Sequence, residues 1–477
     1  MNITVTANDW YALAPLFIVA VAGLAVLLAD LLTPKHAHRY VAIVIAIAGL
    51  VAAGVVCARA YGHDYAAFGG GFIVGGFSVV FQEIVLIGAL GSVVLYGGIG
   101  VERRVPGAVA LLLWSTCGAM LMSGAGSLMT IFLGLELLSL ALYCLCGLSD
   151  RPTARESALK YLILSSTASG FLLFGMALLF GASGSVALAD LVAPALASNP
   201  LLWLGAGMFL IGIAFKLSLV PFHTWSPDVY EGAPLPVTAF MSVVTKAATL
   251  AVFARFIYAA LPAGVDARLL LPVWIIAAIS MIAGNAGMLA QRDLKRLIAY
   301  SGIAQVGYIL TALAGSTPLG LRYAIYYLAA YTFMNVGAFA VAALLSDDGE
   351  QGSTLANYRG LGTRRPVAAA LMTFFLLAMA GLPPTAGFLG KILILSTSAG
   401  SGYIWLGVVL IAGTAISLYA YGKVIFAMYY LREAHAHTRD VHPAVPLAWI
   451  SAIACFVLVL IMTFYPLTPS NVLPLVR

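Results

Sequence analysis

Charged residues are scarce in this sequence. Asp, Glu, Lys and Arg make up 9% of its 477 residues, whereas about 25% is usual in soluble domains. Hydrophobic residues make up 62%, which is more apolar surface than a soluble fold of this length can bury. The net charge of +6 comes from residues in short loops rather than from a basic stripe, so nucleic acid is not an expected partner. The composition predicts a single transmembrane domain over residues 1–477, with the lipid bilayer as its solvent.

Cysteine is also rare, with five residues that all lie in apolar runs. Cys144 and Cys146 are two positions apart, so on a helix they face different sides. No cluster of residues has the spacing of metal ligands, and no glycine-rich loop is placed to bind a nucleotide phosphate. We therefore expect neither a metal nor a redox cofactor in this chain. The N-terminus lacks the basic region of a signal peptide, so we expect the first helix to be kept.

Long apolar runs dominate the sequence. A helix needs about 20 apolar residues to cross the hydrocarbon of a bilayer, and this criterion gives about fourteen such helices. The predicted fold class is therefore an all-α polytopic membrane protein. The predicted spans are 11–32, 40–59, 77–98, 106–124, 126–148, 159–182, 202–225, 235–261, 270–290, 296–315, 321–345, 367–399, 403–430 and 445–466.

Basic residues alternate between the two sides of these spans. Of the 24 Lys and Arg residues, fifteen follow odd-numbered spans and four follow even-numbered spans. Lys and Arg accumulate in cytoplasmic loops, so the loops after odd-numbered spans are assigned to the cytoplasm. This predicts a multi-pass protein of a bacterial inner membrane with both termini in the periplasm.

Proline interrupts the seventh and twelfth spans. Such a break persists within a membrane only where the backbone lines a cavity or is buried in protein. Two breaks five spans apart indicate inverted repeats of five helices, namely spans 4–8 and 9–13. The predicted parts are three N-terminal helices (1–105), the first repeat (106–261), the second repeat (270–430) and a C-terminal helix (445–466). The prolines are Pro221, Pro227, Pro234 and Pro236 in the first break and Pro383 and Pro384 in the second.

Four charged residues lie deep within the predicted spans: Glu136, Lys216, Lys246 and Lys391. A charge at membrane depth costs about 2.5–3.5 kcal/mol or more, and such residues usually mark a path for ions or protons. The alternative is that a buried Lys–Glu pair only locks helices together. Lys216 precedes its break whereas Lys391 follows its own, so the two repeats are not equivalent at these positions.

Other polar residues in the spans have two interpretations each. Glu83, Arg255 and Lys423 lie toward the ends of their spans, where snorkelling to the interface also explains them. His223 lies at the first break, where it could relay protons or cap free carbonyls. Gln305 lies in the middle of the tenth span and can hold a water chain, although its amide cannot titrate.

The deep charges suggest how a proton could move. Burial disfavours the charged form of a lysine, and a nearby carboxylate favours it. If Glu136 approaches Lys216, the lysine holds its proton; if the two separate, Lys216 releases the proton toward Lys246. An external signal that changes their separation would therefore drive proton movement.

Four segments carry a resemblance to a known family: ESALKYLILSSTASGFLLFG (156–175), FKLSLVPFHTWSPDVYEGAP (215–234), RDLKRLIAYSGIAQVGY (292–308) and LPPTAGFLGK (382–391). With these segments the sequence resembles the antiporter-like subunits of respiratory complex I, the bacterial NADH:quinone oxidoreductase, and among these the N type. In that family the carboxylate of span five and the lysines of spans seven, eight and twelve are the proton-channel residues, which implies this role for Glu136, Lys216, Lys246 and Lys391. Many N-type sequences have a histidine where this chain has Gln305.

The resemblance implies a proton-translocating subunit of an enzyme complex, without redox chemistry in this chain. FMN, iron–sulfur clusters and quinone would be bound by partner subunits, and the neighbours would be other membrane-arm subunits, including antiporter-like paralogues. One alternative is a subunit of a multi-subunit cation/proton antiporter or of a membrane-bound hydrogenase. Another is a scaffold subunit whose buried charges carry no protons.

Overall fold

A computed structural model describes residues 6–97, 105–192, 194–260, 271–345, 354–400, 402–431 and 445–465. In this part of the chain there are seventeen α-helices and one β-hairpin. The helices are α1 (Ala7–Leu32), α2 (His38–Arg59), α3 (Gly76–Tyr96), α4 (Val105–Ser123), α5 (Leu128–Cys146), α6 (Pro152–Ser183), α7 (Pro200–Lys216), α8 (Trp225–Gly232), α9 (Leu235–Arg255), α10 (Leu271–Leu289), α11 (Leu294–Leu313), α12 (Pro318–Leu345), α13 (Leu361–Arg364), α14 (Pro366–Ala380), α15 (Ala386–Gly400), α16 (Ile404–Tyr430) and α17 (Val445–Phe464).

Each predicted span is occupied by helix. Among the described residues, twelve helices are long and apolar enough to cross a membrane, so the chain is a mostly helical, multi-pass membrane protein. The seventh predicted span (202–225) contains most of α7 and ends at the first residue of α8, so α8 lies beyond it. The twelfth predicted span (367–399) contains α14 and α15 almost completely. The predicted span ends at 98, 261, 270 and 466 lie outside the described residues, as do the basic residues Arg103, Arg104, Arg268, Arg432, Arg439 and Arg477.

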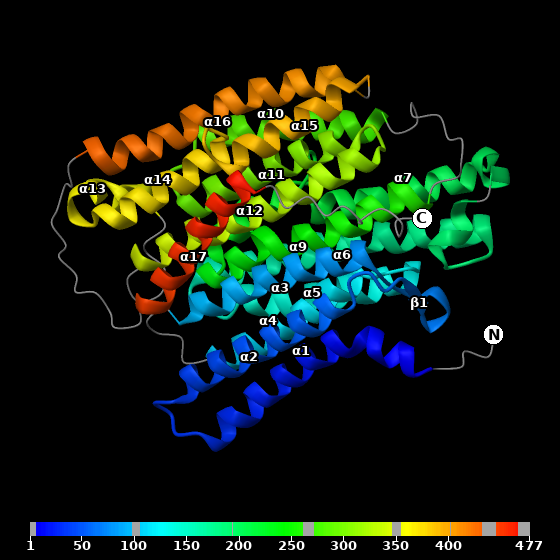
Figure 1. Cartoon of the computed structure of the whole chain (residues 1–477), viewed down its shortest axis with the longest axis horizontal. Coiled ribbons are helices and arrows are strands. Elements are labelled where there is room, and N and C mark those ends of the chain that lie inside the picture. The colour runs from blue at the N-terminus through cyan, green and yellow to red at the C-terminus, as the bar shows by residue number, and fades with distance from the viewer. Residues whose placement is uncertain are drawn as a thin grey trace.

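The helices lie side by side, with α1 and α2 along one flank and α10, α15 and α16 along the opposite flank (Figure 1). Helix α9 lies at the centre, where it packs against α3, α4 and α12, and all its residues are buried. By contrast, α1 and α2 leave most of their residues partly or fully exposed, as expected for helices that face lipid. The deep interior is therefore built around α9, α11 and α12.

Close packing of α6 against α7 depends on two glycines. A Cβ added to Gly175 would lie 2.4 Å from the Phe209 nitrogen, and one added to Gly205 would lie 2.9 Å from the Gly175 oxygen. Small residues let transmembrane helices approach closely. This approach places the hydroxyl groups of α6 beside the C-terminal end of α7.

Both predicted breaks are present. Helix α7 ends at Lys216 and α8 begins at Trp225, while α14 ends at Ala380 and α15 begins at Ala386. Gly381 ends α14 with φ +83°, a left-handed conformation that favours glycine. Each break leaves helix C-terminal carbonyls available to side chains within the interior.

A short hairpin between α2 and α3 was not predicted. Strand β1 (Tyr65–Ala67) pairs antiparallel with β2 (Phe72–Val74), with Ala66 opposite Ile73, across the 3₁₀ turn η1 (Phe68–Gly70). Strands of three residues on either side of a glycine run give no readable alternation of polar and apolar residues. The prediction that Cys144 and Cys146 face different sides of a helix is confirmed, since Cys146 is buried whereas Cys144 is exposed.

Candidate functional site

The three lysines predicted at membrane depth are buried in the interior of the helical bundle. The exposed fractions are 2% for Lys216, 1% for Lys246 and 5% for Lys391. They come from three elements: the last residue of α7, the middle of α9 and the first half of α15. A buried ammonium group is tolerated only where polar groups replace its water, so the partners of each lysine define the site.

Lys216 is surrounded by hydroxyl groups from α5 and α6. Its Nζ donates to Ser139 Oγ at 2.7 Å, to Ser165 Oγ at 2.9 Å and to the Tyr161 hydroxyl at 3.3 Å. The same nitrogen lies over the rings of Tyr143 and Tyr161, at 5.9 and 5.0 Å from their centroids. Three oxygen acceptors and two aromatic faces therefore accommodate this ammonium group.

Glu136 lies close to this cluster and is only partly buried. Its carboxylate accepts a hydrogen bond of 2.6 Å from Ser169 Oγ. Ser169 is one turn beyond Ser165 on α6, and Ser139 is about one turn beyond Glu136 on α5. Ser165, Ser169 and Lys216 also line one narrow crevice. Glu136 and Lys216 therefore bond to serines one turn apart on α6, and no direct ion pair joins them among the described residues.

Lys246 has a much sparser polar environment. Its Nζ lies 3.5 Å from the Tyr331 hydroxyl on α12 and 5.7 Å from the centroid of that ring. Gly302 of α11 is beside both groups, since an added Cβ would lie 2.0 Å from Nζ and 3.0 Å from the Tyr331 hydroxyl. The absence of a side chain at Gly302 therefore provides the space for the lysine head group.

Lys391 reaches back across the second break to the end of α14. Its Nζ donates to the carbonyl oxygens of Met379 at 3.2 Å and Ala380 at 2.8 Å, and lies 4.7 Å from the centroid of the Tyr308 ring. Carbonyls at a helix C-terminus carry partial negative charge, which favours a cation there. The broken helix therefore supplies the acceptors for this lysine.

Gln305 shares one of these carbonyls. Its Nε2 donates to the Met379 oxygen at 3.1 Å, and its Oε1 accepts from the Tyr327 hydroxyl. The amide is thus hydrogen-bonded at both ends and lies next to Lys391. Gln305 belongs to the site, with Met379 as the shared acceptor.

The remaining predicted residues do not contact the three buried lysines. His223 is half-buried in the first break, near the Tyr300 ring at 6.5 Å, and its Nδ1 has no hydrogen-bond partner in the part of the chain that the structure describes. Lys423 is exposed and donates to the Leu289 oxygen at 3.3 Å, at the end of α10. Glu83 is half-buried on α3, facing Gly54 of α2.

Two basic residues are more deeply buried than the sequence indicates. Arg255 does not snorkel: it is 2% exposed, and its guanidinium donates to Ser78 Oγ at 2.8 Å. Lys295 falls in the predicted loop between spans 270–290 and 296–315, but it lies in the first turn of α11, is 1% exposed and donates to the Ala233 oxygen at 2.9 Å. Lys295 lies between Leu294 and Arg296, so its immediate neighbours in the sequence give no signal for its burial.

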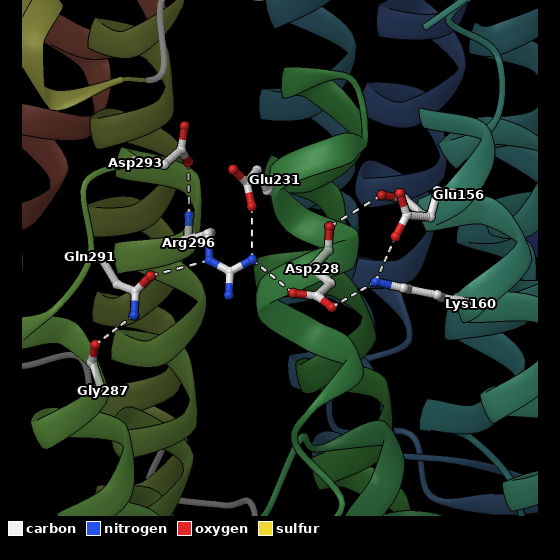
Figure 2. A network of polar contacts seen from close by, with 9 residues as sticks. Glu156, Lys160, Asp228, Glu231, Gly287, Gln291, Asp293 and Arg296 are labelled. Atoms are coloured by element: carbon white, nitrogen blue, oxygen red, sulfur yellow. Dashed lines mark hydrogen bonds and ion pairs between the residues drawn. The ribbon is translucent and has the colours of Figure 1, made fainter. Parts of the chain in front are cut away.

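A charged network joins three helices on one side of this interior (Figure 2). Asp228 of α8 accepts from Lys160 of α6 at 3.0 Å and from Arg296 of α11 at 2.7 Å. Arg296 also bonds Glu231 at 2.8 Å, and Lys160 bonds Glu156 at 2.8 Å. Partial burial by itself raises the pKa of Asp228, but the hydrogen bonds and positive charges of Lys160 and Arg296 outweigh it and lower the pKa. The network therefore holds α8 between α6 and α11.

Chemically, the arrangement can exchange protons. Lysines, a carboxylate and hydroxyl groups can each bind or pass on a proton. Within the described residues, no group of three or more His, Cys, Asp or Glu side chains is placed to hold a metal ion.

Known proteins resemble the chain over most of its length. A family model described as NADH:quinone oxidoreductase/Mrp antiporter, TM, matches residues 125–417. A curated protein of Trichlorobacter lovleyi named NADH-quinone oxidoreductase subunit N is 40% identical over 425 residues, which cover 87% of this chain and 86% of that protein. A chain of respiratory complex I from Thermus thermophilus with bound aureothin is 33% identical, with a TM-score of 0.82, over 95% of this chain and 97% of that chain. A chain of the Mrp complex from Dietzia sp. has a TM-score of 0.81 at 21% identity, over 95% and 94% of the two chains, which shows a shared fold.

Proposed function

Because the chain belongs to the NADH:quinone oxidoreductase/Mrp antiporter family, with curated relatives named NADH-quinone oxidoreductase subunit N over most of its length, we propose that it is a proton-translocating membrane subunit of such an oxidoreductase. The observation that supports this function is the set of three buried lysines with the half-buried Glu136 beside the first. Charged groups at this depth are costly unless they serve a path. Here Lys216 has serine and tyrosine hydroxyls as partners, Lys246 has one tyrosine hydroxyl, and Lys391 has two backbone carbonyls.

The partners suggest a role for each group. Hydroxyls can turn and either donate or accept, so Ser139 and Ser165 can support Lys216 in both its charged and neutral forms. The Ser169 hydroxyl can transmit a change at Glu136 to this cluster, because Ser165 lies one turn away on the same helix. Lys246 has the fewest acceptors and would receive a proton only transiently. Lys391 is the last lysine of the series and is held by helix C-terminal carbonyls.

The proposed path does not need redox chemistry in this chain. FMN, iron–sulfur clusters and quinone are assigned to partner subunits, and electron transfer there would drive the proton steps here. The proposed neighbours are other membrane-arm subunits, including antiporter-like paralogues. The proposed location is a bacterial inner membrane, with both termini in the periplasm.

The test uses the assembled complex in proteoliposomes. Lys216→Ala should lower the number of protons moved per electron, while the exposed loop variant Lys35→Ala should leave it unchanged. The amount of complex and its thermal unfolding temperature are measured in parallel, so that a failure to assemble is recognised. An unchanged proton yield in assembled Lys216→Ala complex would contradict the proposal.

The similarity in fold to a chain of the Mrp complex supports a second candidate, a subunit of a cation/proton antiporter. The two candidates differ in what purifies with the tagged chain. Flavin and NADH:quinone activity in the same fraction support the oxidoreductase. Sodium-dependent proton exchange without NADH oxidation supports the antiporter.

A further inference from the structure

Lys391 lies over the face of a buried tyrosine ring, in addition to its bonds with the two carbonyls that end α14. Its Nζ is 4.7 Å from the centroid of the Tyr308 ring, whereas the lysine-to-ring distances at Lys216 and Lys246 are between 5.0 and 5.9 Å. We propose that Tyr308 and Asn285 are positioning residues for Lys391: the Tyr308 ring stabilises the ammonium form, and Asn285 holds the ring in place. This inference rests on the proposed function and adds two uncharged residues to its last lysine.

The ring favours one protonation state of the lysine. The face of an aromatic ring carries negative charge density and attracts a cation within about 6 Å of its centroid, most strongly where water is excluded. Lys391 is 5% exposed and Tyr308 is 0% exposed, so water is excluded from this contact. A neutral amine gains little from the same ring face. The ring therefore acts in the same direction as the Met379 and Ala380 carbonyls, which also favour the ammonium form.

Asn285 of α10 binds the outer end of the Tyr308 side chain. Its Nδ2 donates to the Tyr308 hydroxyl oxygen at 2.7 Å and to the Met281 carbonyl oxygen, one turn earlier on α10, at 2.6 Å. Asn285 is 0% exposed, so no water competes for these bonds at the surface. The Met281 bond fixes the amide to its own helix, and the Tyr308 bond fixes the phenol to α10. The ring is thus held at both ends, by the backbone of α11 and by Asn285.

The packing around this bond leaves no room for the amide or the phenol to move. Helix α11 packs against α10, α15 and α16, and the last three lie along one flank of the bundle (Figure 1). A Cβ added to Gly413 of α16 would lie 2.6 Å from Asn285 Nδ2 and 3.1 Å from the Tyr308 hydroxyl. A Cβ added to Gly307 of α11 would lie 2.5 Å from Met281 Cγ. Two glycines therefore let α10 and α16 close over the bond.

The other titratable groups around Lys391 are neutral side chains. On the helices packed against α15 they are the phenols of Tyr308, Tyr327 and Tyr421, from α11, α12 and α16, and the thiol of Cys455 on α17. No ion pair joins Lys391 to a carboxylate in the part of the chain that the structure describes. Phenols and thiols are neutral near pH 7. Lys391 is therefore the charged group on which the ring acts.

This arrangement predicts a specific dependence on pH. Without the ring, or with the ring displaced, Lys391 would lose its proton at a lower pH than in the wild type. Proton-coupled turnover would then begin to fall earlier as the pH rises, so the alkaline limb of the pH profile would move to lower pH. A loss of packing alone lowers turnover by a similar factor at every pH and leaves this limb in place.

The experiment measures proton-coupled turnover against pH in assembled complex in proteoliposomes. Tyr308→Leu removes the ring and should move the alkaline limb to lower pH by about half a unit to one unit, which is about three- to tenfold less turnover at a fixed pH on that limb. Asn285→Leu keeps the ring and removes its anchor, so it should give a smaller shift in the same direction. The matched control is Tyr326→Phe, which removes a buried hydroxyl that donates to the Met462 oxygen at 2.8 Å and should give no shift.

Conservative variants test the two residues separately and do not depend on the assembly of Tyr308→Leu. Tyr308→Phe and Asn285→Leu break the same hydrogen bond, so their shifts should be similar and the double variant should shift no further. Replacing Tyr308 by a ring-fluorinated phenylalanine nearly keeps the shape of the phenylalanine ring but weakens its negative face, so it should shift the limb further than Tyr308→Phe. An alkaline limb that ring fluorination does not move would overturn the role of the ring, and additive shifts would overturn the role of Asn285.

Lys391→Ala, measured in the same preparation, separates this inference from the proposed function. If Lys391→Ala loses proton-coupled turnover while the Tyr308 and Asn285 variants keep the pH profile of the wild type, only the positioning role is wrong. If Lys391→Ala pumps normally, the proposed function is wrong at Lys391 itself.

Discussion

Gly302 offers the sharpest test of the Lys246 site, because a single methyl group would occupy the position of the ammonium. A Cβ at Gly302 would lie 2.0 Å from Lys246 Nζ and 3.0 Å from the Tyr331 hydroxyl, whereas ordinary contacts begin near 3.4 Å. The nitrogen would therefore have to retreat by about 1.4 Å in a region where Lys246 is 1% exposed. Such overpacking costs about 1–3 kcal/mol. A displacement of about 1 Å can slow a chemical step by about 10²-fold.

We therefore expect Gly302→Ala to assemble with a lower unfolding temperature and to lose proton-coupled turnover by about 10- to 100-fold. Thermal unfolding and proton uptake in proteoliposomes measure the two effects. Gly181→Ala is the control, since no atom lies within 4 Å of its added Cβ on α6.

The double variant Gly302→Ala/Lys246→Ala sharpens the test. Removing the lysine head group removes the clash, so stability should return while proton transfer stays lost. Wild-type proton turnover in Gly302→Ala would refute the assignment of Lys246 as a fixed proton site.

Two further predictions concern the surrounding contacts. Asp228→Asn should lower the free energy of unfolding at pH 7 by no more than an exposed ion pair contributes, about 0.2–1 kcal/mol, because the Asp228 side chain is 36% exposed. The unfolding temperature should therefore fall only slightly. Since the pKa of Asp228 is lowered on folding, its contribution is present above the ordinary carboxyl pKa of about 3.9 and lost as the pH falls through the folded value; the difference between wild type and Asp228→Asn should therefore vanish in acid unfolding scans. Gln305→Leu should destabilise the complex by about 1–3 kcal/mol, because it leaves the buried Tyr327 hydroxyl without its acceptor, while the Met379 carbonyl keeps Lys391 as a donor. An unchanged unfolding temperature of Gln305→Leu would show that the Tyr327–Gln305 bond contributes nothing.

The helices and their breaks were predictable because they depend on local sequence. Apolar runs of membrane length gave α1, α9 and α16 within a few residues. The prolines before α8 and α15 marked the breaks, since proline cannot continue the hydrogen-bond ladder. Depth along a span likewise identified Lys216, Lys246 and Lys391, all of which are buried.

The partners of these residues were not predictable, because they come from other helices. Depth along a helix gives no information on which side a residue faces or which helix covers it. Lys295 appeared to lie in a loop, yet the start of α11 packs beneath the end of α8, where the Ala233 carbonyl receives it. The serines that bond to Glu136 and to Lys216 are ordinary helix residues in the sequence, and only the packing of α5, α6 and α7 brings them together.

The same packing explains why the two broken helices use their lysines differently. At the end of α7, the Trp225 indole nitrogen donates to the Phe215 carbonyl at 3.0 Å, and the Leu219 nitrogen donates to the Ala214 carbonyl at 2.9 Å. These carbonyls are therefore occupied by neutral donors, and the Lys216 ammonium is left to rotatable hydroxyls.

At the end of α14, the carbonyls of Met379 and Ala380 are taken by Lys391 itself, with Gln305 sharing the first. Fixed carbonyls at a helix C-terminus can only accept, so they accommodate the ammonium form, whereas hydroxyls accommodate both forms. The surroundings of Lys216 thus suit both of its protonation states, whereas those of Lys391 suit the ammonium form. Two breaks of similar appearance in the sequence therefore give unequal sites, and the difference arises from whether an indole or an ammonium group caps the first half of the helix.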